Sequence, residues 1–446
     1  MDWYLYGNAL VDETTDVVFT ENSLDVWVSS DDTTLSGVAQ DFTLTEKSTV
    51  LFSISLDAHS GTEKRNAQII LLDINGNILE THNLTFNENG SKIKKGYRFD
   101  LEAGNYTIII GHSEGNYEVN GYADKLKIYP YVDFVQNPAT HKKSVWIWDV
   151  NEITNLDNML STYQRLGIDC VYQYISETNI QNRAAELSEY IAKLHEQQMD
   201  CYIIYGDPAY YNNIEELKNK INLVNNYNIT YSNNKLDGLI WNVEPHSSSL
   251  DSDGLTTEER IPIWTDNARI AYLYANSLGI RTLFANPVWY SSSAYAGTVL
   301  SFITFSDGIS YMNYTKVSLI DDIEDEVEIT KDNNCWMESI SEIQNPEDDV
   351  DESITFYNEG IFAVHQAWQE IMNYFNYNKL SFSYHYLTPL KILMLDYDFN
   401  YLNEEGLTEL INKICAEIDS TAEMYITEEE PAEMNAGDCW WKVEEI

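Results

Sequence analysis

The clearest chemical signal in the chain is the segment Asn-Val-Glu-Pro-His at residues 242–246, which follows an apolar run. Side chains two positions apart on a strand point to the same face, so Asn242 and Glu244 are expected to lie together. Pro245 has no amide hydrogen to donate to a neighbouring strand and therefore ends the run. The sequence predicts a strand whose C-terminal end presents an amide and a carboxylate, followed at once by His246.

A second pair of glutamates lies on another predicted strand far downstream. Glu338 and Glu342 share one face of that strand by the same alternation. Two carboxyl groups from separate strands that meet at one open face can act as a general acid and as a base or nucleophile. Glu244 is the candidate acid and Glu342, at the exit of its strand, is the candidate for the second carboxylate, with Glu338 as the fallback.

Other polar and aromatic side chains also fall where predicted strands end. Aromatic residues form 13% of the chain, with 32 Tyr and 11 Trp, and an aromatic ring with a polar tip suits the face of a sugar. The predicted substrate-binding set is Trp148, Asp149, Asn242, His246, Tyr311, Asn313 and His385. The two histidines can also carry protons near neutral pH. Asp207 supplies a further carboxylate, at the C-terminal end of the strand predicted at Cys201–Asp207.

These residues need a scaffold that brings strand ends together, and residues 143–446 predict one. Eight apolar strands alternate with helical stretches such as Asn182–Gln197 and Ile354–Asn373, a pattern typical of a (β/α)8 barrel. In such a barrel the site lies at the C-terminal ends of the strands. The eight strands are predicted at Val145–Val150, Ile168–Ile175, Cys201–Asp207, Gly238–Glu244, Thr282–Val288, Gly308–Asn313, Cys335–Glu342 and Leu380–Tyr386. The alternative is a doubly wound open sheet, although no glycine-rich nucleotide loop supports it. An acidic extension is expected from about residue 391, with a helix near Glu404–Ile418.

Residues 1–132 follow a different pattern, with short alternating strands separated by turns. This spacing is typical of an antiparallel β-sandwich of the jelly-roll kind. Asn75-Gly76 between two apolar runs predicts a type I′ hairpin turn. Residues 133–142, with Pro138, break the alternation and are predicted to be a linker between the two domains.

The segment Leu236-Asp-Gly-Leu-Ile-Trp-Asn-Val-Glu-Pro-His246 resembles the fourth strand of bacterial glycoside-hydrolase barrels, which reads Asp-Gly-apolar-x-x-Asp-x-Glu-Pro-Tyr. The first acid of that motif is Asn242 here and its aromatic residue is His246. The likeness spans most of residues 144–390 and continues through the following segments. They are Ser310–Tyr314, Ser341-Glu342, Glu352–Tyr357 and Ser383–Tyr386.

An Asn shortly before a strand-four Glu, with a second Glu on strand seven, is also similar to the large clan of retaining glycosidases. That resemblance implies Glu244 as acid/base and a strand-seven Glu as nucleophile. In the first domain, residues 99–106 resemble a turn of bacterial jelly-roll modules, many of which bind carbohydrate. Together the resemblances imply an extracellular or cell-surface glycoside hydrolase, or a hydrolase-like glycan binder, that acts on a polysaccharide.

The composition and charge of the chain argue against several classes of binding partner. The 72 acidic against 26 basic residues give a formal charge of −46, a field that repels nucleic acid and anionic lipid. No run approaches the roughly 18 apolar residues of a membrane helix, and no leader is visible at the start. The five cysteines have neither zinc nor redox spacing. We therefore expect no cofactor, no metal, no nucleic acid and no membrane insertion, and glycan as the partner.

One alternative function belongs to a different class. A non-catalytic cell-surface or virion structural protein could retain a degenerate glycosidase barrel and self-assemble, and Asn242 in the place of the acid, together with the high charge, fits this reading. A glycan-binding barrel without turnover lies between the two.

Overall fold

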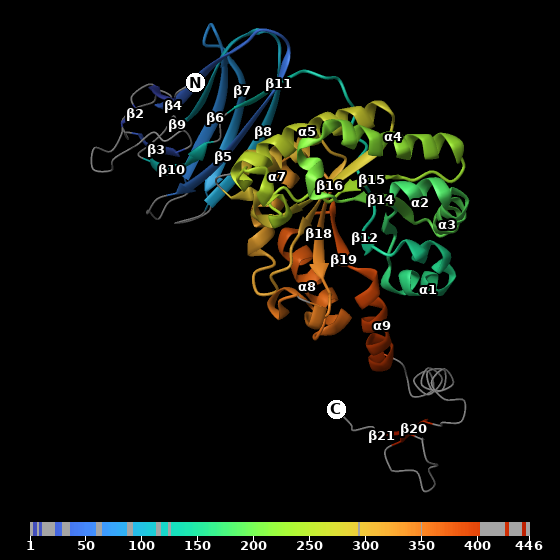
Figure 1. The fold of residues 1–446 in the computed structure, drawn as a ribbon. Coiled ribbons are helices and arrows are strands. Elements are labelled where there is room, and N and C mark those ends of the chain that lie inside the picture. Colours follow the sequence, from blue (N-terminus) through green and yellow to red (C-terminus); the bar gives the residue numbers. More distant parts are fainter. Residues whose placement is uncertain are drawn as a thin grey trace.

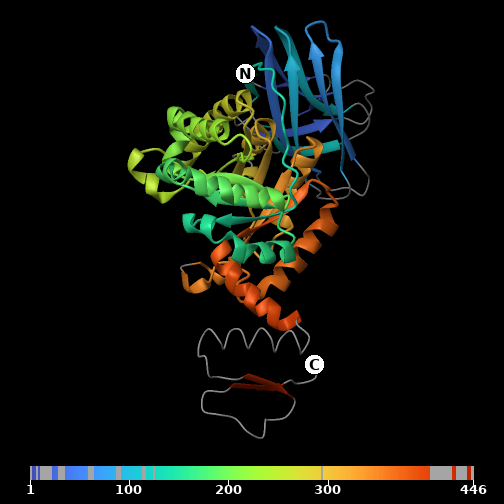
Figure 2. The same cartoon turned by 90° about the vertical axis from the view of Figure 1, so that its right-hand side faces the viewer.

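The computed structural model describes residues 3–6, 9–10, 23–28, 36–58, 65–86, 92–112, 117–123, 126–292, 295–348, 350–401, 424–427 and 439–442. Along the chain, two stacked antiparallel sheets are followed by a closed ring of parallel strands wrapped in helices (Figure 1; Figure 2). This order confirms the predicted β-sandwich followed by a (β/α)8 barrel. The helix predicted near Glu404–Ile418 lies outside the described residues.

The sandwich has its strands in two sheets. The strands are β1 (Tyr4–Tyr6), β2 (Ala9–Leu10), β3 (Ser23–Val28), β4 (Ser36–Leu44), β5 (Ser48–Ala58), β6 (Arg65–Asp73), β7 (Ile78–Phe86), β8 (Lys92–Leu101), β9 (Gly104–His112), β10 (Tyr117–Ala123) and β11 (Lys127–Pro130). In the described part of the chain, one sheet has the order β1-β4-β9-β6-β7. In the other sheet, β5 pairs with β8 along one edge and with β10 and β11 along the other, and β10 continues to β3 and β2.

Alternate side chains of the strands fill the space between the two sheets. Phe52 and Ile54 of β5 pack there with Ile69 of β6 and Ile108 and Ile110 of β9, all fully or almost fully buried. Burial of one face of each sheet is the driving force that stacks the two sheets.

The turn predicted at Asn75-Gly76 is present, but its type differs from the prediction. Gly76 has a φ of +78°, while Asn75 is not among the residues with positive φ, and a type I′ turn needs both. The loop is longer than two residues because the Asp73 carboxylate organises it, accepting from the backbone N–H groups of Asn75 and Asn77 at 2.8 Å each. The Asn77 side-chain amide, which donates to the same carboxylate at 2.8 Å, and these backbone groups lower the pKa of Asp73.

The barrel closes because its first and last strands pair, with Ser144 beside Ser383, and this closure excludes the open sheet. Its strands, all among the described residues, are β12 (Lys143–Ile147), β13 (Cys170–Tyr174), β14 (Asp200–Tyr205), β15 (Gly238–Trp241), β16 (Arg281–Pro287), β17 (Gly308–Met312), β18 (Met337–Glu342) and β19 (Leu380–His385). β12 begins two residues before its predicted strand, and each of the others lies inside a predicted strand or within one residue of it.

Helices cover the outside of the barrel (Figure 1). The α-helices are α1 (Leu156–Leu166), α2 (Glu177–Asn182), α3 (Ala184–Glu196), α4 (Ile214–Thr230), α5 (Thr257–Ser277), α6 (Ala296–Thr304), α7 (Glu324–Asp332), α8 (Gly360–Phe375) and α9 (Leu387–Tyr401). Short 3-10 helices lie in the loops, at Val150–Thr154, Pro208–Asn212, Ser248–Asp253, Val288–Ser291, Asp321–Ile323, Pro346–Asp348 and Glu352–Ile354. Because α9 crosses residue 391, residues 391–401 belong to the barrel. Beyond it, β20 (Met424–Thr427) pairs with β21 (Cys439–Lys442).

The predicted linker is an irregular segment that lies against the barrel. The Gln136 side-chain amide donates to the carbonyls of Ile303, Thr304 and Ser306, at 2.9 to 3.1 Å. Asp307 accepts from the Asn137 backbone at 2.7 Å. The segment is therefore held along its length and does not behave as a free tether.

The sandwich itself packs on the barrel through β8. Lys94, which is buried, donates to the Ser291 carbonyl at 2.8 Å and pairs with Asp325. Lys95 pairs with Asp332 at 2.7 Å. Gly96, the next residue of β8, lies close to Leu300 of α6. A Cβ atom placed on this glycine would be 2.9 Å from a Leu300 methyl group. Charge pairing and close packing therefore fix the two domains against each other.

Candidate active site

The interior of the barrel contains a polar cluster around Glu338. Its carboxyl group accepts from the hydroxyls of Ser144 at 2.6 Å, Ser310 at 2.8 Å and Tyr172 at 3.0 Å. The linker residue His141 approaches it to 3.5 Å, and Glu338 is completely buried. Glu338 is thus a satisfied core group near the N-terminal ends of the strands, remote from the open face where substrate would bind.

Glu342 occupies the opposite end of the same strand, where β18 runs into its loop. One carboxylate oxygen accepts from the backbone N–H groups of Ile343 and Gln344, each at 2.9 Å. The other oxygen lies 2.6 Å from Nδ1 of His385. Because the Trp148 indole N–H donates to Nε2 of His385 at 3.3 Å, the hydrogen of this ring is on Nδ1 and is directed at Glu342. Trp148, His385 and Glu342 form one hydrogen-bonded row across three strand ends.

Glu244 follows β15 and is the more open of the two carboxylates, with 37% of its side chain exposed. The Asn242 amide donates to it over a long 3.4 Å, and Nε2 of His246 lies 3.7 Å away. His246 packs edge-on against Trp289 with ring centroids 5.2 Å apart. Burial lowers the pKa of His246, and the nearby Glu244 opposes that shift only in part.

Tyr314 connects the two halves of the site. Its ring stacks on His385 with centroids 6.0 Å apart. Burial, then the charge of Glu342, then that of Glu244 raise the pKa of the Tyr314 phenol well above its usual range. The hydroxyl therefore stays protonated. Two contact groups thus stand at the C-terminal face of the barrel. They are Asn242, Glu244 and His246 beyond β15, and Trp148, His385 and Glu342 at the ends of β12, β19 and β18.

Besides Glu338, three predicted residues lie elsewhere. Tyr311 is completely buried among the helix-facing residues of the barrel and cannot contact substrate. Asn313, also buried, donates to the Leu319 carbonyl at 2.9 Å and so holds the loop after β17. Asp149 is exposed and caps the 3-10 helix at Val150–Thr154, accepting from the Asn151 backbone at 2.8 Å.

The strand phase explains these placements. On β17, Ser310 faces Glu338 inside the barrel and Met312 packs with the interior residues, so the inward series continues to Tyr314. Tyr311 and Asn313 belong to the opposite series. Tyr314 was not in the predicted set, and counting in steps of two from Ser310, opposite Glu338, would have found it.

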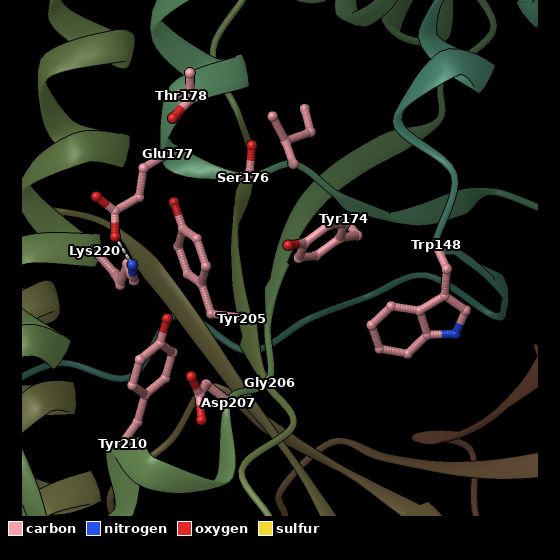
Figure 3. Close-up of a pocket in the computed structure, with 11 residues that line it drawn as sticks. Trp148, Tyr174, Ser176, Glu177, Thr178, Tyr205, Gly206, Asp207, Tyr210 and Lys220 are labelled. Carbon is pink, nitrogen blue, oxygen red and sulfur yellow. Dashed lines mark ion pairs between the residues drawn. The ribbon is translucent and has the colours of Figure 1, made fainter.

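A pocket of about 560 Å³ opens beside Trp148 at the ends of β12, β13 and β14 (Figure 3). Tyr174, Tyr205 and Tyr210 line it, with Trp148 on one side and the Lys220–Glu177 ion pair on the other. The carboxylate of Asp207 and the backbone of Gly206 complete the wall on the barrel side.

Nothing in this arrangement is organised as a metal centre: among the described residues, no group of three or more His, Cys, Asp or Glu side chains is placed to hold a metal ion. Cys170 and Cys201 lie on neighbouring strands but are both free, because Cys170 faces the barrel interior and Cys201 faces the helices. In the part of the chain that the structure describes, no helix has the length and apolarity needed to cross a membrane.

The fold and site define the class as a β-sandwich joined to a (β/α)8 barrel with carboxylates at its C-terminal face. No family model matches the chain, and no curated relative matches it. Among solved structures, it is similar to the CBM22-1 and GH10 modules of Clostridium thermocellum endo-1,4-β-D-xylanase 10B in complex with xylohexaose, with 12% identity, a TM-score of 0.37 and 86% of each chain covered.

Two further likenesses are of the same order. A ruminal GH26 endo-β-1,4-mannanase has 10% identity and a TM-score of 0.38, with 82% of this chain and 88% of that one covered. A putative α-L-fucosidase from Bacteroides thetaiotaomicron has 10% identity and a TM-score of 0.42, with 62% of this chain and 96% of that one covered. These structural neighbours are glycoside hydrolases, one of them solved with a carbohydrate-binding module. What the site does must be argued from its own side chains.

Proposed function

We propose that this protein is a glycoside hydrolase that cleaves a polysaccharide at the C-terminal face of its barrel, with Glu244 as the general acid and Glu342 as the nucleophile or base. The observation that carries the proposal is that both carboxylates stand at the C-terminal face of one closed barrel, Glu244 just beyond β15 and Glu342 at the end of β18. Such a pair is the minimum that glycosidic cleavage requires.

The surroundings of Glu342 fit the ionised role. An ionised carboxylate only accepts hydrogen bonds, and Glu342 has three donors directed at it, two from the backbone and one from His385. These donors fix the position of the oxygen that would meet the sugar carbon, which lowers the cost of reaching the reactive geometry.

The surroundings of Glu244 fit the acid role. It is partly exposed and has only long contacts to Asn242 and His246, so a glycosidic oxygen can approach it. The lowered pKa of His246 keeps that ring neutral near pH 7.

We extend the proposal to the sandwich and to location. A sandwich fixed beside the barrel would contact the same polymer at a constant distance from the site of cleavage. The polysaccharide that we propose as the substrate is met outside cells, so we place the protein in the extracellular space or at a cell surface.

The test is the substitution Glu244→Gln, which keeps the shape of the side chain and removes its proton. We expect kcat on the cognate glycan to fall by about 10²- to 10⁴-fold, the usual contribution of a general acid, with unchanged thermal unfolding and retained glycan binding. Glu189→Gln, at an exposed position of α3, is the matched control and should behave as the parent. Turnover retained in the Glu244→Gln variant would exclude the assignment, and glycan binding without turnover in the parent would indicate a binding protein.

A further inference from the structure

The pocket beside Trp148 is a second chemical environment next to the two carboxylates, and it is physically continuous with both. Trp148 lines the pocket and also donates to His385, which holds Glu342. On the other side, Gly206 lies against Asn242: a Cβ atom on this glycine would be 3.0 Å from the Asn242 carbonyl oxygen. Any polymer seated over Glu342 and Glu244 therefore passes the mouth of this pocket.

Its walls are suited to sugar rings. Tyr174, with 37% of the residue exposed, lies beside Trp148 with ring centroids 6.2 Å apart, and Tyr210 approaches from the far side. The rings present flat faces and polar tips (Figure 3). Tyr205 is 4% exposed, and its hydroxyl has no hydrogen-bond partner among the described residues.

The charges around the pocket are predominantly negative. Lys220 is buried and already paired with Glu177 and, at 2.9 Å, with Glu216. It also lies over the rings of Tyr205 and Tyr210, with its ammonium 5.6 and 5.2 Å from their centroids.

Asp207 adds an exposed carboxylate, of which one oxygen accepts from the Ala209 backbone at 2.9 Å. Glu177, Glu216 and Asp207 are thus three carboxylates near one ammonium. Among the described residues that line the pocket, the one cation is Lys220, and it is already paired with Glu177 and Glu216.

We propose that this pocket is a sugar-binding subsite of the same active site, that it accepts neutral or amine-bearing sugar units, and that it rejects sugars carrying carboxylates. The proposal rests on the proposed glycoside hydrolase function and specifies its substrate class. A pocket of about 560 Å³ is within the usual range for small-ligand sites. An incoming carboxylate would meet uncompensated negative charge, whereas a hydroxyl or an ammonium would not.

The experiment uses the full chain carrying Glu244→Gln, so that bound oligosaccharide is not cleaved. It is screened against immobilised oligosaccharides of three kinds: neutral, amine-bearing and uronate-bearing. We expect the binders to be neutral or amine-bearing. In this background, Tyr174→Ala should weaken the best binder about tenfold, which corresponds to the loss of one stacking ring.

Asp207→Asn tests the charge. Asn caps a helix as well as Asp does, so the loop after β14 should keep its shape, and binding of uronate-bearing glycans should increase relative to neutral ones. Tyr374→Ala, an exposed tyrosine of α8, should change neither affinity.

Preferred binding of uronates, or glycan binding that Tyr174→Ala leaves unchanged, would overturn the subsite and leave the proposed function standing. Absence of binding to all three kinds of glycan would remove the proposed function together with the subsite.

Discussion

Glu342 and Glu244 are held by different kinds of contact, and at the scale of single residues this difference fits the roles proposed for them. Short hydrogen bonds from the backbone and from His385 fix Glu342. Glu244 has long contacts with two side chains, the Asn242 amide at 3.4 Å and His246 at 3.7 Å. A group that must meet a carbon atom at a set position benefits from being fixed, whereas a group that follows a leaving oxygen benefits from remaining accessible.

His385 is predicted to be a positioning residue for Glu342. His385→Ala removes one of the three donors, and a hydrogen bond to a charged group is worth about 1.5 to 3 kcal/mol. We therefore expect kcat to fall roughly 10- to 100-fold with little change in KM, measured by steady-state kinetics. His385→Asn, which retains a side-chain donor, should recover part of the loss. Equal losses in both variants would mean that His385 does not act through this hydrogen bond.

Glu338 is predicted to stabilise the barrel and to take no part in cleavage. Glu338→Ala removes the acceptor of the Ser144, Tyr172 and Ser310 hydroxyls, of which Ser144 also contacts Ser383 and Tyr172 also contacts His141. Leaving a buried donor unsatisfied costs about 1 to 3 kcal/mol, so the free energy of unfolding in urea should fall by about that amount. Glu338→Gln keeps one acceptor oxygen and should lose less. It should also retain turnover, and complete inactivation of a well-folded Gln variant would contradict this assignment.

The sequence correctly predicted that Glu244 and Glu342 lie at strand ends, but it predicted the wrong direction for Tyr311 and Asn313. Glu244 and Glu342 stand at the ends of their strands, where alternation and the break at Pro245 leave little freedom. Tyr311 and Asn313 were assigned to the site because they stand near a strand end, although the phase of the strand directs them outward. Local spacing does not reveal phase until one inward residue is known, and Ser310 became that reference only when the structure placed it against Glu338.

At the scale of elements, the barrel strands were predictable because both faces of each are buried, which produces continuous apolar runs. The sandwich was harder to read. β10 contains Asn120-Gly121, which normally indicates a turn, yet Gly121 pairs with Leu24 on one side and Leu56 on the other. β4, which begins Ser-Gly and includes Gln40, is equally hard to predict, since its apolar alternation is weak and only sheet pairing reveals it.

Gly96 permits the close contact between the sandwich and the barrel. In Gly96→Val, the added atoms would overlap Leu300 and Ile329, and overpacking of this kind costs about 1 to 3 kcal/mol. We expect a lower free energy of unfolding and faster proteolysis of residues 131–142, measured by urea denaturation and by mapping the cleavage products. Thr81→Val, at an exposed position of β7, is the control. A Gly96→Val variant as protease-resistant as the parent would show that this contact does not hold the domains together.

At the scale of the whole molecule, stability is expected to decrease with pH because of one buried carboxyl group near the domain contact. Burial raises the pKa of Glu326 from 4.5 to about 8, although Lys94 partly opposes the shift. Between these values the folded chain binds a proton that the unfolded chain has lost. The free energy of unfolding contributed by this group is therefore fully present below about pH 4.5 and is lost as the pH rises through about 8.

Glu326→Gln removes this dependence. The free energy of unfolding of the variant minus that of the parent should increase by a few kcal/mol between about pH 4.5 and about pH 8.5. Urea denaturation at both pH values measures it, and the comparison between variant and parent cancels the other titrating groups. A difference that stays constant with pH would show that Glu326 does not carry the proton.

The docked segment before the barrel has a consequence for how this gene can be divided. The His141 carbonyl accepts from Trp336 at 3.2 Å and from Ser381 at 2.6 Å, while Gln136 and Asn137 bind the end of α6 and the start of β17. Residues that precede the first barrel strand therefore form the floor of the barrel. A barrel fragment that begins at residue 143 would lose that floor, whereas one that begins near residue 131 would retain it. Any recombination that joins this barrel to another domain therefore has to include the segment.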